Sequence, residues 1–424
     1  MNDIETHIEL QGETYFAGTL YTHLRRGREG SSFRYDAEYL TNLHAYAFEP
    51  AMPLALGDFP FTQGLPRSFR DASPDRWGRL LIEKGLRHRW HIEAEPPRTI
   101  TETDYLLSTN DFTRQGALRF RTKEDIAFRA VGEHVPQLIS LPKLLSASNK
   151  LCRGDLEESE SYDAVKILLD AGTGSLGGAR PKTSVLDSDS RGGNTLYLAK
   201  FPHPADAWDV MRWEKIALDL AEYAGVVVPE RRLLPIGGTN VLVLRRFDRS
   251  EKNERIGYMS AMTLLESEEG QSRDYLDLAD ALSEISGSTS DDLTELWRRI
   301  LFSLAINNTD DHLRNHAMLR TANVWRLSPA FDLNPVPDLK SGRVTAIGGA
   351  IFFEDGWKAA FEMREWFGIN DDKAARITSA LLDAMSQWEA IARKNGAQIE
   401  ELRRFAPIFM RAIAALKNLP IDRR

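Results

Sequence analysis

The stretch Thr309-Asp310-Asp311-His312-Leu313-Arg314-Asn315 is the most informative part of this 424-residue chain. It places Asp310 five residues before Asn315, directly after the apolar stretch 300–306. Another aspartate, Asp332, follows farther along the chain. Carboxylate and amide oxygens are the hard ligands that Mg²⁺ prefers. The order of these residues therefore predicts a divalent metal site next to an acid that can act as a base.

Protein kinases use the same Asp-x4-Asn interval in the loop that performs phosphoryl transfer. There the aspartate positions the attacking hydroxyl, the asparagine holds Mg²⁺, and a later aspartate completes the metal site. The interval alone is weak evidence, because a chain with 62 acidic residues often contains it by chance. Asp311 competes with Asp310 for the role of base, but only Asp310 has the five-residue interval to Asn315.

A glycine-rich segment, residues 172–178, is the candidate for phosphate binding. Glycine lets backbone N–H groups approach phosphate oxygens closely, and four glycines in seven residues disfavour a helix or a central strand. The pattern is neither G-x-G-x-x-G nor the Walker sequence, so a surface loop is the alternative. The candidate binding residues are Gly174, Ser175, Gly177 and Gly178.

Three further side chains could complete a phosphotransfer site. Lys200 lies near the end of a predicted strand, 195–201, on the same face as Leu196 and Leu198. It either reaches water at the strand end or points into a cleft, where it would hold the α/β-phosphates. Glu214, on the predicted amphipathic helix 212–224, would orient this lysine or would simply be a solvated glutamate. His312 would contact phosphate or brace its loop.

The composition is that of a soluble globular protein, with 42% hydrophobic and 27% charged residues. A net charge of −8 argues against nonspecific binding of nucleic acid or membrane surfaces as the main role. A single cysteine, Cys152, excludes an internal disulfide framework and cysteine-rich metal sites. We expect a cytoplasmic protein, because residues 1–5 do not resemble a signal peptide and no apolar stretch is long enough to span a bilayer.

The length favours two or three domains. Alternating aromatic stretches at 14–21 and 32–35 predict strands, and a helix is expected to start near 74–82 with Asp71 or Ser73 as its cap. Strands are also expected at 182–186, 231–234 and 240–246, and helices dominate beyond about residue 255. The predicted parts are a small α/β domain (1–120), a helical connection (121–165), an N-lobe-like part (166–255) and a helical C-lobe (256–424). We therefore predict an α+β fold with a bilobed, kinase-like core.

Taken together, these motifs resemble the HipA-type serine/threonine kinases, which are toxins of bacterial toxin–antitoxin modules. The combination is specific although no single motif is. In the N-terminal part the similar segments are 18–21, 33–36, 64–69 and 73–79. In the core they are the serine-bearing loop 175–183, the strand end Lys200-Phe201-Pro202, the hinge Arg246-Phe247-Asp248-Arg249, the loop 309–315, Phe331-Asp332 and the segment 346–349.

The resemblance implies ATP and Mg²⁺ as cofactors and a protein hydroxyl as acceptor, on an aminoacyl-tRNA synthetase in the better-known members, where the modification stops translation. It implies a small DNA-binding antitoxin as partner, with no membrane and no direct contact with nucleic acid without the antitoxin. Ser175 matches the autophosphorylation site of the family, and Arg246, Phe247 and Asp248 match its nucleotide-binding hinge. The chain departs from the family pattern at Arg180 and Arg245, where the family often has Gln and Glu.

Two alternative functions stay open from the sequence. One is a small-molecule or lipid kinase built on the same core. The other is a non-catalytic co-repressor that acts on DNA through an antitoxin. The complete set of Asp310, Asn315 and Asp332 argues against lost catalysis.

Overall fold

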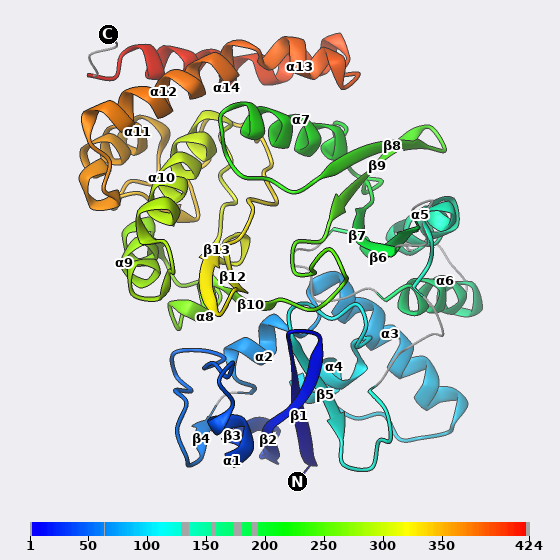
Figure 1. Ribbon diagram of the computed structural model, residues 1–424. Coiled ribbons are helices and arrows are strands. Elements are labelled where there is room, and N and C mark those ends of the chain that lie inside the picture. The colour runs from blue at the N-terminus through cyan, green and yellow to red at the C-terminus, as the bar shows by residue number, and fades with distance from the viewer. Residues whose placement is uncertain are drawn as a thin grey trace. The chain divides into compact units, whose positions relative to one another are not determined.

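The computed structural model describes residues 2–62, 64–128, 135–153, 158–172, 180–188 and 194–420 (Figure 1). The chain divides into two compact units, one comprising residues 1–205 and 234–259 and the other comprising residues 206–233 and 260–424. The first unit includes the predicted small domain, the predicted helical connection and the strands that flank the glycine-rich segment. The second unit includes the predicted helix 212–224 and the helical C-terminal part.

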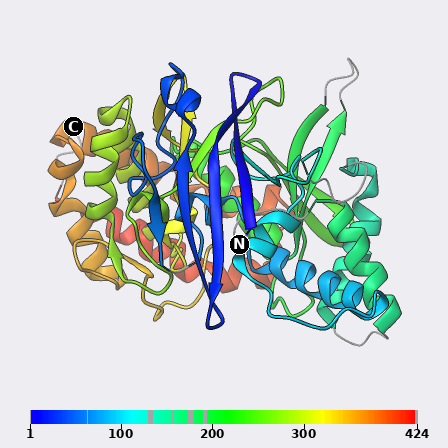
Figure 2. The same ribbon diagram turned by 90° about the horizontal axis from the view of Figure 1, so that it is seen from below.

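A five-stranded antiparallel sheet forms the N-terminal part of the first unit, and Figure 2 shows its long strands side by side. Along the first strand, buried and partly exposed side chains alternate, as expected for a strand with one face on the core. The predicted strands 14–21 and 32–35 are confirmed as parts of β2 and β3. The order is β4-β3-β2-β1-β5, with bounds Asn2–Leu10 (β1), Glu13–Arg25 (β2), Arg28–Tyr35 (β3), Phe59–Phe61 (β4) and Leu118–Thr122 (β5).

The N-terminal helices are α1 (Ala37–Thr41), α2 (Arg67–Asp71), α3 (Arg76–Ile92) and α4 (Glu102–Ser108). The helix expected near 74–82 is α3, but its cap is neither Asp71 nor Ser73. Asp75 is the N-cap, and its Oδ1 accepts a hydrogen bond of 2.8 Å from the backbone N–H of Gly78. An aspartate immediately before a helix is among the most favourable caps.

A second sheet in the first unit carries the strands predicted around the glycine-rich segment. Its order is β6-β7-β9-β8, and its β6–β7 and β7–β9 pairs are antiparallel. The bounds are Lys182–Ser188 (β6), Asn194–Lys200 (β7), Arg231–Ile236 (β8) and Thr239–Arg245 (β9). Two helices, α5 (Leu141–Arg153) and α6 (Glu158–Asp170), follow a short 3₁₀ turn, η1 (Leu138–Ser140), and precede this sheet in the chain.

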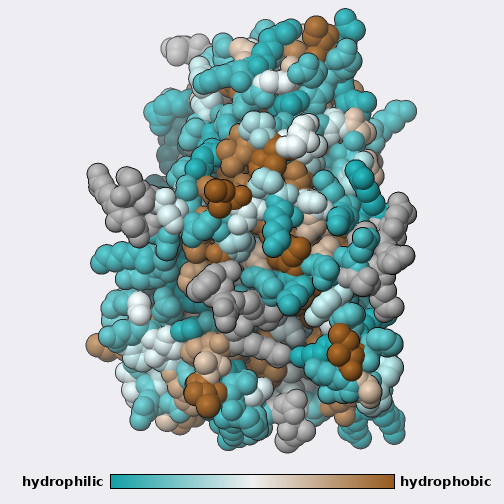
Figure 3. All heavy atoms as spheres, turned by 90° about the vertical axis from the view of Figure 1, so that its right-hand side faces the viewer, coloured by the Kyte–Doolittle hydropathy of each residue, from teal (hydrophilic) through white to brown (hydrophobic). Residues whose placement is uncertain are grey.

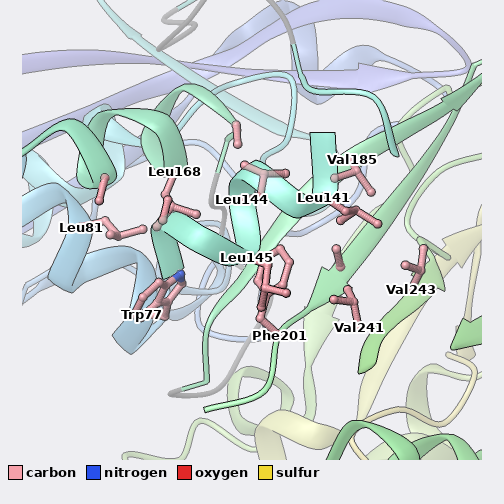
Figure 4. Packing of buried hydrophobic residues seen from close by; sticks show 14 of the residues in the cluster. Trp77, Leu81, Leu141, Leu144, Leu145, Leu168, Val185, Phe201, Val241 and Val243 are labelled. Atoms are coloured by element: carbon pink, nitrogen blue, oxygen red, sulfur yellow. The ribbon is translucent and has the colours of Figure 1, made fainter. Parts of the chain in front are cut away.

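Helices α3, α5 and α6 pack on one face of the second sheet (Figure 4). The cluster includes Trp77 and Leu81 from α3, Leu141, Leu144 and Leu145 from α5, Leu168 from α6, and Val185, Phe201, Val241 and Val243 from the sheet region. The region predicted as a helical connection thus contributes core helices. Their amphipathic pattern supplies the apolar face that covers the strands.

The second unit is mostly helical. The predicted helix 212–224 is confirmed as α7 (Val210–Tyr223), which ends before Gly225 in a left-handed conformation with φ of 82°. The other helices are α8 (Ala261–Leu264), α9 (Tyr275–Ile285), α10 (Thr289–Ala305), η2 (Leu313–Asn315), α11 (Phe353–Glu362), η3 (Arg364–Phe367), α12 (Asp371–Ser386), α13 (Trp388–Lys394) and α14 (Ile399–Lys417).

Short strands complete the second unit. An antiparallel hairpin joins β12 (Ala317–Thr321) to β13 (Val324–Leu327), and β11 (Arg273–Asp274) pairs in parallel with β14 (Thr345–Ala346). Before α8 in the chain lies the short strand β10 (Gly257–Ser260), whose residues 257–259 belong to the first unit. The mixture of sheets and helices confirms the predicted α+β class.

Stacked aromatic side chains join the helices of the second unit. The ring of Trp213 on α7 lies 3.7 Å from that of Phe405 on α14, measured between centroids. The ring of Trp388 on α13 stacks on the ring of Phe409 on α14, with 4.8 Å between the ring centroids.

No helix in the described part of the chain is long and apolar enough to cross a membrane. The face drawn in Figure 3 is mostly hydrophilic, with hydrophobic side chains in small separate groups.

Candidate active site

The candidate catalytic loop, residues 309–316, connects α10 to β12 in the second unit. Helix α10 ends at Ala305, and Asn307 then adopts a left-handed conformation with φ of 54°, which turns the chain out of the helix. The side-chain amide of Asn307 donates to the carbonyl oxygens of Val336 (2.7 Å) and Asp338 (2.9 Å). One residue therefore ties the start of the loop to the segment that follows Asp332.

The two adjacent aspartates of the loop lie in opposite environments. Asp310 is exposed, whereas only 4% of Asp311 is exposed. Asp311 accepts hydrogen bonds from Ser303 Oγ (2.8 Å), the Tyr275 hydroxyl and His316 Nε2 (2.9 Å). Burial alone would raise the pKa of Asp311, but His316 and these donors hold that pKa well below its ordinary value. Asp311 is therefore an ionised anchor inside the protein, and of the two aspartates only Asp310 is exposed.

The pKa of Asp310 is raised from its ordinary value. Partial burial is the largest cause, and the negative charges of Asp332 and Asp311 add to it, while His312 opposes it. This electrostatic interaction requires Asp310, Asp332 and His312 to lie close together in the second unit. Perturbed carboxyl groups of this kind are frequent in catalytic sites, although structural ion pairs also perturb pKa values.

Asn315 ends the short 3₁₀ turn η2 inside the loop. Its side-chain N–H₂ donates to the backbone carbonyl of Asp310 at 3.2 Å, and its backbone N–H donates to the carbonyl of His312 at 2.8 Å. The amide nitrogen is thus directed back into the loop, which leaves the amide oxygen for a cation. The Nδ1 atom of His312 is buried without a hydrogen-bond partner among the described residues.

Asp332 adopts a left-handed backbone conformation with φ of 57°. Aspartate tolerates this region better than most residues, and such conformations concentrate at functional sites. Its Oδ1 accepts a hydrogen bond of 3.0 Å from the side chain of Asn334. The predicted base and the two predicted metal ligands, Asn315 and Asp332, therefore belong to one locality of the second unit.

The donors of this locality fit Mg²⁺. Asn315 and Asp332 offer one amide oxygen and one carboxylate, which are hard ligands. Within the described ranges, no group of three or more His, Cys, Asp or Glu side chains could hold a metal ion by itself. Mg²⁺ commonly takes one or two protein carboxylates and completes its shell with water and phosphate oxygens. The set therefore suits a cation that arrives with a nucleotide.

In the first unit, Lys200 lies on the face of β7 that does not pack on α5 and α6. Tyr197, Ala199 and Phe201 belong to the helix-covered core, whereas Leu196 and Leu198 share the face of Lys200, as its strand parity predicted. Lys200 is buried, which disfavours the alternative of an ammonium exposed at a fraying strand end.

A second lysine, Lys182, is directly opposite Lys200 in the β6–β7 pair. Two like charges facing each other across strands are unfavourable unless one is compensated. Asp75, the N-cap of α3, supplies that compensation through a 2.8 Å ion pair between its Oδ2 and Lys182 Nζ. Both side chains are almost completely buried.

The predicted phosphate-binding residues Gly174, Ser175, Gly177 and Gly178 lie outside the described residues. At the edge of this segment, Gly172 has φ of 70°, and a Cβ there would collide with the side chain of Thr113. Glu214, on α7 of the second unit, is only 1% exposed, so it is not the solvated glutamate that was the alternative from the sequence.

The hinge segment Arg246-Phe247-Asp248 forms a buried ionic node in the first unit. Asp248 accepts from Arg246 Nη2 (2.6 Å), Arg249 Nη1 (2.7 Å) and the backbone N–H of Gly116 (2.9 Å). These ion pairs hold the pKa of Asp248 well below its ordinary value, against the effect of burial. The charged side chains are thus bound to protein groups, and a nucleotide could use only the backbone of this segment or the half-buried Phe247.

Comparisons with known proteins were made for the whole chain. Residues 174–389 match the family model of the HipA-like C-terminal domain, and this match spans half of the chain. The chain belongs to the HipA-like family. A search of curated proteins found no match.

Two solved structures are similar to this HipA-like chain. The first is HipA of Shewanella oneidensis MR-1, solved with HipB and its operator DNA, at 14% identity and a TM-score of 0.61 over 98% of this chain and 96% of that one. It shows that the HipA-like chain has the fold of HipA. The second is the proinflammatory kinase CtkA of Helicobacter pylori, at 16% identity and a TM-score of 0.39 over 57% of this chain and 94% of that one.

Sequence reasoning did not find the partners that hold the site of this HipA-like protein in place. Asp75 and Asn307 were not candidates, because each acts on a residue far away in the chain. A signal was available for Asp75, since an aspartate directly after Ser-Pro and before an amphipathic pattern is a recognised helix start. No local pattern indicated that Asp75 would also pair with Lys182.

Proposed function

We propose that this HipA-like protein is an ATP- and Mg²⁺-dependent protein serine/threonine kinase and the toxin of a toxin–antitoxin module. The observation that carries the proposal is the convergence of Asp310, Asn315 and Asp332 in one part of the second unit. The proposal is supported by the hydrogen bond from the Asn315 amide to the Asp310 carbonyl and by the raised pKa of Asp310, to which burial and then the charge of Asp332 contribute.

Each residue has one task in the proposal. Asp310 positions the acceptor hydroxyl and takes up its proton, Asn315 and Asp332 hold Mg²⁺, and Lys200 holds the nucleotide phosphates. Bound Mg²⁺ would neutralise the charge that develops on the transferred phosphoryl group. The sequence pattern assigns the phosphate cover to residues 172–178 and the orientation of Lys200 to Glu214, and it places His312 beside the base. Phosphoryl transfer depends on such positioning and charge neutralisation more than on covalent chemistry.

The acceptor and the partner follow from the family. We propose a protein hydroxyl as acceptor, with an aminoacyl-tRNA synthetase as the first class to test, and a small DNA-binding antitoxin as the partner. HipA of Shewanella oneidensis was solved with HipB and operator DNA, which supports such a partner. We also propose Ser175 as an autophosphorylation site, since about two negative charges in a glycine loop would compete with ATP phosphates.

The test is transfer of label from [γ-³²P]ATP with Mg²⁺ to proteins of a cell lysate and to the protein itself. Asp310→Asn and Asp332→Asn should abolish transfer while leaving the circular dichroism spectrum and melting temperature close to wild type. Asp372→Asn, which changes an exposed acid in the first turn of α12, is the matched control and should label normally. Ser175→Ala should lose self-labelling but keep transfer to another protein.

Each other outcome has a definite meaning. Normal labelling by Asp310→Asn would contradict the assignment of the base. ATP consumption that occurs only with purified metabolites or lipids, without any labelled protein, would retain the phosphotransferase and overturn the protein acceptor. A folded wild-type protein without ATP consumption or stabilisation by Mg-ATP would favour the non-catalytic co-repressor.

A further inference from the structure

The buried carboxylate of Asp311 joins elements from different parts of the second unit. The Tyr275 hydroxyl on α9 and Ser303 Oγ on α10 both donate to its Oδ2, the latter at 2.8 Å. Nε2 of His316, the residue just before β12, lies 2.9 Å from its Oδ1. Because the carboxylate is ionised and can only accept, the hydrogen of this last bond is on His316 Nε2.

The segment 343–345 also forms hydrogen bonds with Asp311 and with its neighbours Ser303 and Thr309. Thr345 Oγ1 donates to the backbone carbonyl of Asp311 at 2.6 Å, and Arg343 donates to Ser303 Oγ at 2.5 Å. The backbone N–H of Val344 donates to the carbonyl of Thr309 at 3.0 Å. The first residues of the catalytic loop are therefore held from several sides.

The bond between Asp311 and His316 differs from those of Tyr275 and Ser303 because it closes the loop on itself, as the 3.2 Å bond from the Asn315 amide to the Asp310 carbonyl also does from within. Asp311 directly follows the proposed base, Asp310, and His316 directly follows the proposed metal ligand, Asn315. Their side chains thus connect the two ends of the short segment that separates the base from the metal ligand. The bonds from Tyr275 and Ser303 fix the same carboxylate to helices outside the loop and do not span it.

We propose that Asp311 and His316 are positioning residues that set the separation between Asp310 and Asn315. This inference rests on the proposed function, because the separation matters only if both residues serve Mg-ATP. Neither side chain can act on a substrate directly, since each is only 4% exposed. The effect is indirect: a loop closed at both ends presents the base and the amide oxygen in one arrangement, as partners behind metal ligands commonly do.

Three variants test this positioning role. His316→Phe removes the donor while keeping a ring of similar size, and His316→Gln returns an N–H₂ donor at nearly the reach of Nε2. Tyr275→Phe is the matched control, because it removes a hydrogen bond from the same carboxylate without opening the loop. If His316→Phe does not fold, His316→Asn replaces it, since its amide is too short to reach Asp311.

Two measurements are made on all variants. The first is kcat and KM for ATP as a function of Mg²⁺ concentration. His316→Phe should weaken the apparent Mg²⁺ affinity or kcat about 10- to 100-fold. In His316→Gln, both the apparent Mg²⁺ affinity and kcat should be within about threefold of the wild-type values. Tyr275→Phe should lower the melting temperature without changing the apparent Mg²⁺ affinity or kcat.

The second measurement is hydrogen exchange of the amides of residues 309–316, which does not depend on activity. Exchange should accelerate in His316→Phe and be normal in His316→Gln and Tyr275→Phe.

The outcomes separate this inference from the proposed function. A wild-type protein without phosphotransfer would contradict the proposed function, and the exchange of residues 309–316 would still decide whether the bond closes the loop. An active wild type with unchanged Mg²⁺ dependence and unchanged exchange in His316→Phe would overturn the positioning role. Equal kinetic losses in His316→Phe and Tyr275→Phe would also overturn it, because they would indicate a general loss of stability.

Discussion

The ion pair between Asp75 and Lys182 leads to a sharp prediction about stability. The two residues are 107 positions apart, and their side chains are 5% and 4% exposed. Asp75 has two separate tasks: Oδ1 caps α3 through the Gly78 N–H, and Oδ2 binds Lys182. Asp75→Asn keeps an amide oxygen for the cap but removes the negative charge, so it isolates the second task.

The expected magnitudes follow from this geometry. Removing one partner of a buried ion pair costs about 3–5 kcal/mol, because the other charge remains buried without compensation. Asn caps a helix about as well as Asp, so Asp75→Asn should cost about 3 kcal/mol, and Asp75→Ala should lose about 1 kcal/mol more. Lys182→Met should cost less, about 1–2 kcal/mol, because the N-terminus of α3 still stabilises the Asp75 carboxylate. The double variant Asp75→Asn with Lys182→Met should recover most of the loss.

The assay is urea unfolding of the wild type and the four variants without nucleotide, monitored by circular dichroism. Hydrogen exchange of the α3 amides is measured on the same proteins. The double-mutant cycle should give a coupling of about 3 kcal/mol between the two positions. Additivity of the single variants within about 0.5 kcal/mol would refute the reasoning, because it would mean that the pair contributes nothing as a pair. A loss below about 1 kcal/mol in Asp75→Asn would refute it as well.

Two further predictions concern the first unit. Burial raises the pKa of Glu49, so the folded wild type should lose stability as pH rises from about 4.5 through that raised value. Glu49→Gln cannot titrate at this position. Melting curves from pH 4 to 8 should therefore show that the stability of Glu49→Gln relative to wild type increases with pH. Melting temperatures of the two proteins that change with pH in parallel would contradict this. Leu168→Ala, at a fully buried position, should cost about 2–5 kcal/mol in urea unfolding, and Leu80→Ala, at a 41% exposed position on α3, less than about 1 kcal/mol. Similar losses at the two positions would contradict the assignment of the core.

Features that depend on short-range periodicity could be predicted from the sequence. The apolar stripe of α7 has the helical period, and Gly225 ends it because a left-handed residue must follow. The placement of Lys200 on the face of Leu196 and Leu198 follows from strand alternation alone. Such features need only neighbouring residues, so one sequence contains the information.

Features that depend on distant partners could not be predicted. Residues 121–165 are polar with a helical pattern, which suggested a connection, but the apolar stripes of α5 and α6 cover the second sheet. The hinge segment shows the same limit. The family resemblance gave this segment a place at the nucleotide, but it gave no indication that Asp248 accepts bonds from Arg246, Arg249 and the N–H of Gly116, which is 132 positions away from Asp248. A charge pattern does not reveal whether its partner is a ligand or the protein.

The adjacent aspartates of the candidate catalytic loop show both a feature that neighbouring residues predict and a feature that depends on distant partners. The interval to Asn315 favoured Asp310 over Asp311, but spacing alone gives no physical reason for two carboxylates in a row. The structure supplies one, because Asp310 is exposed whereas Asp311 lies among donors from α9, from α10 and from His316, just before β12. An ionised, buried carboxylate is costly without hydrogen bonds, so the bonds from Tyr275, Ser303 and His316 together stabilise Asp311 in its buried position. The acid proposed as the base and the acid proposed to fix its position are thus separated by burial, and exchanging their environments should remove both proposed roles at once.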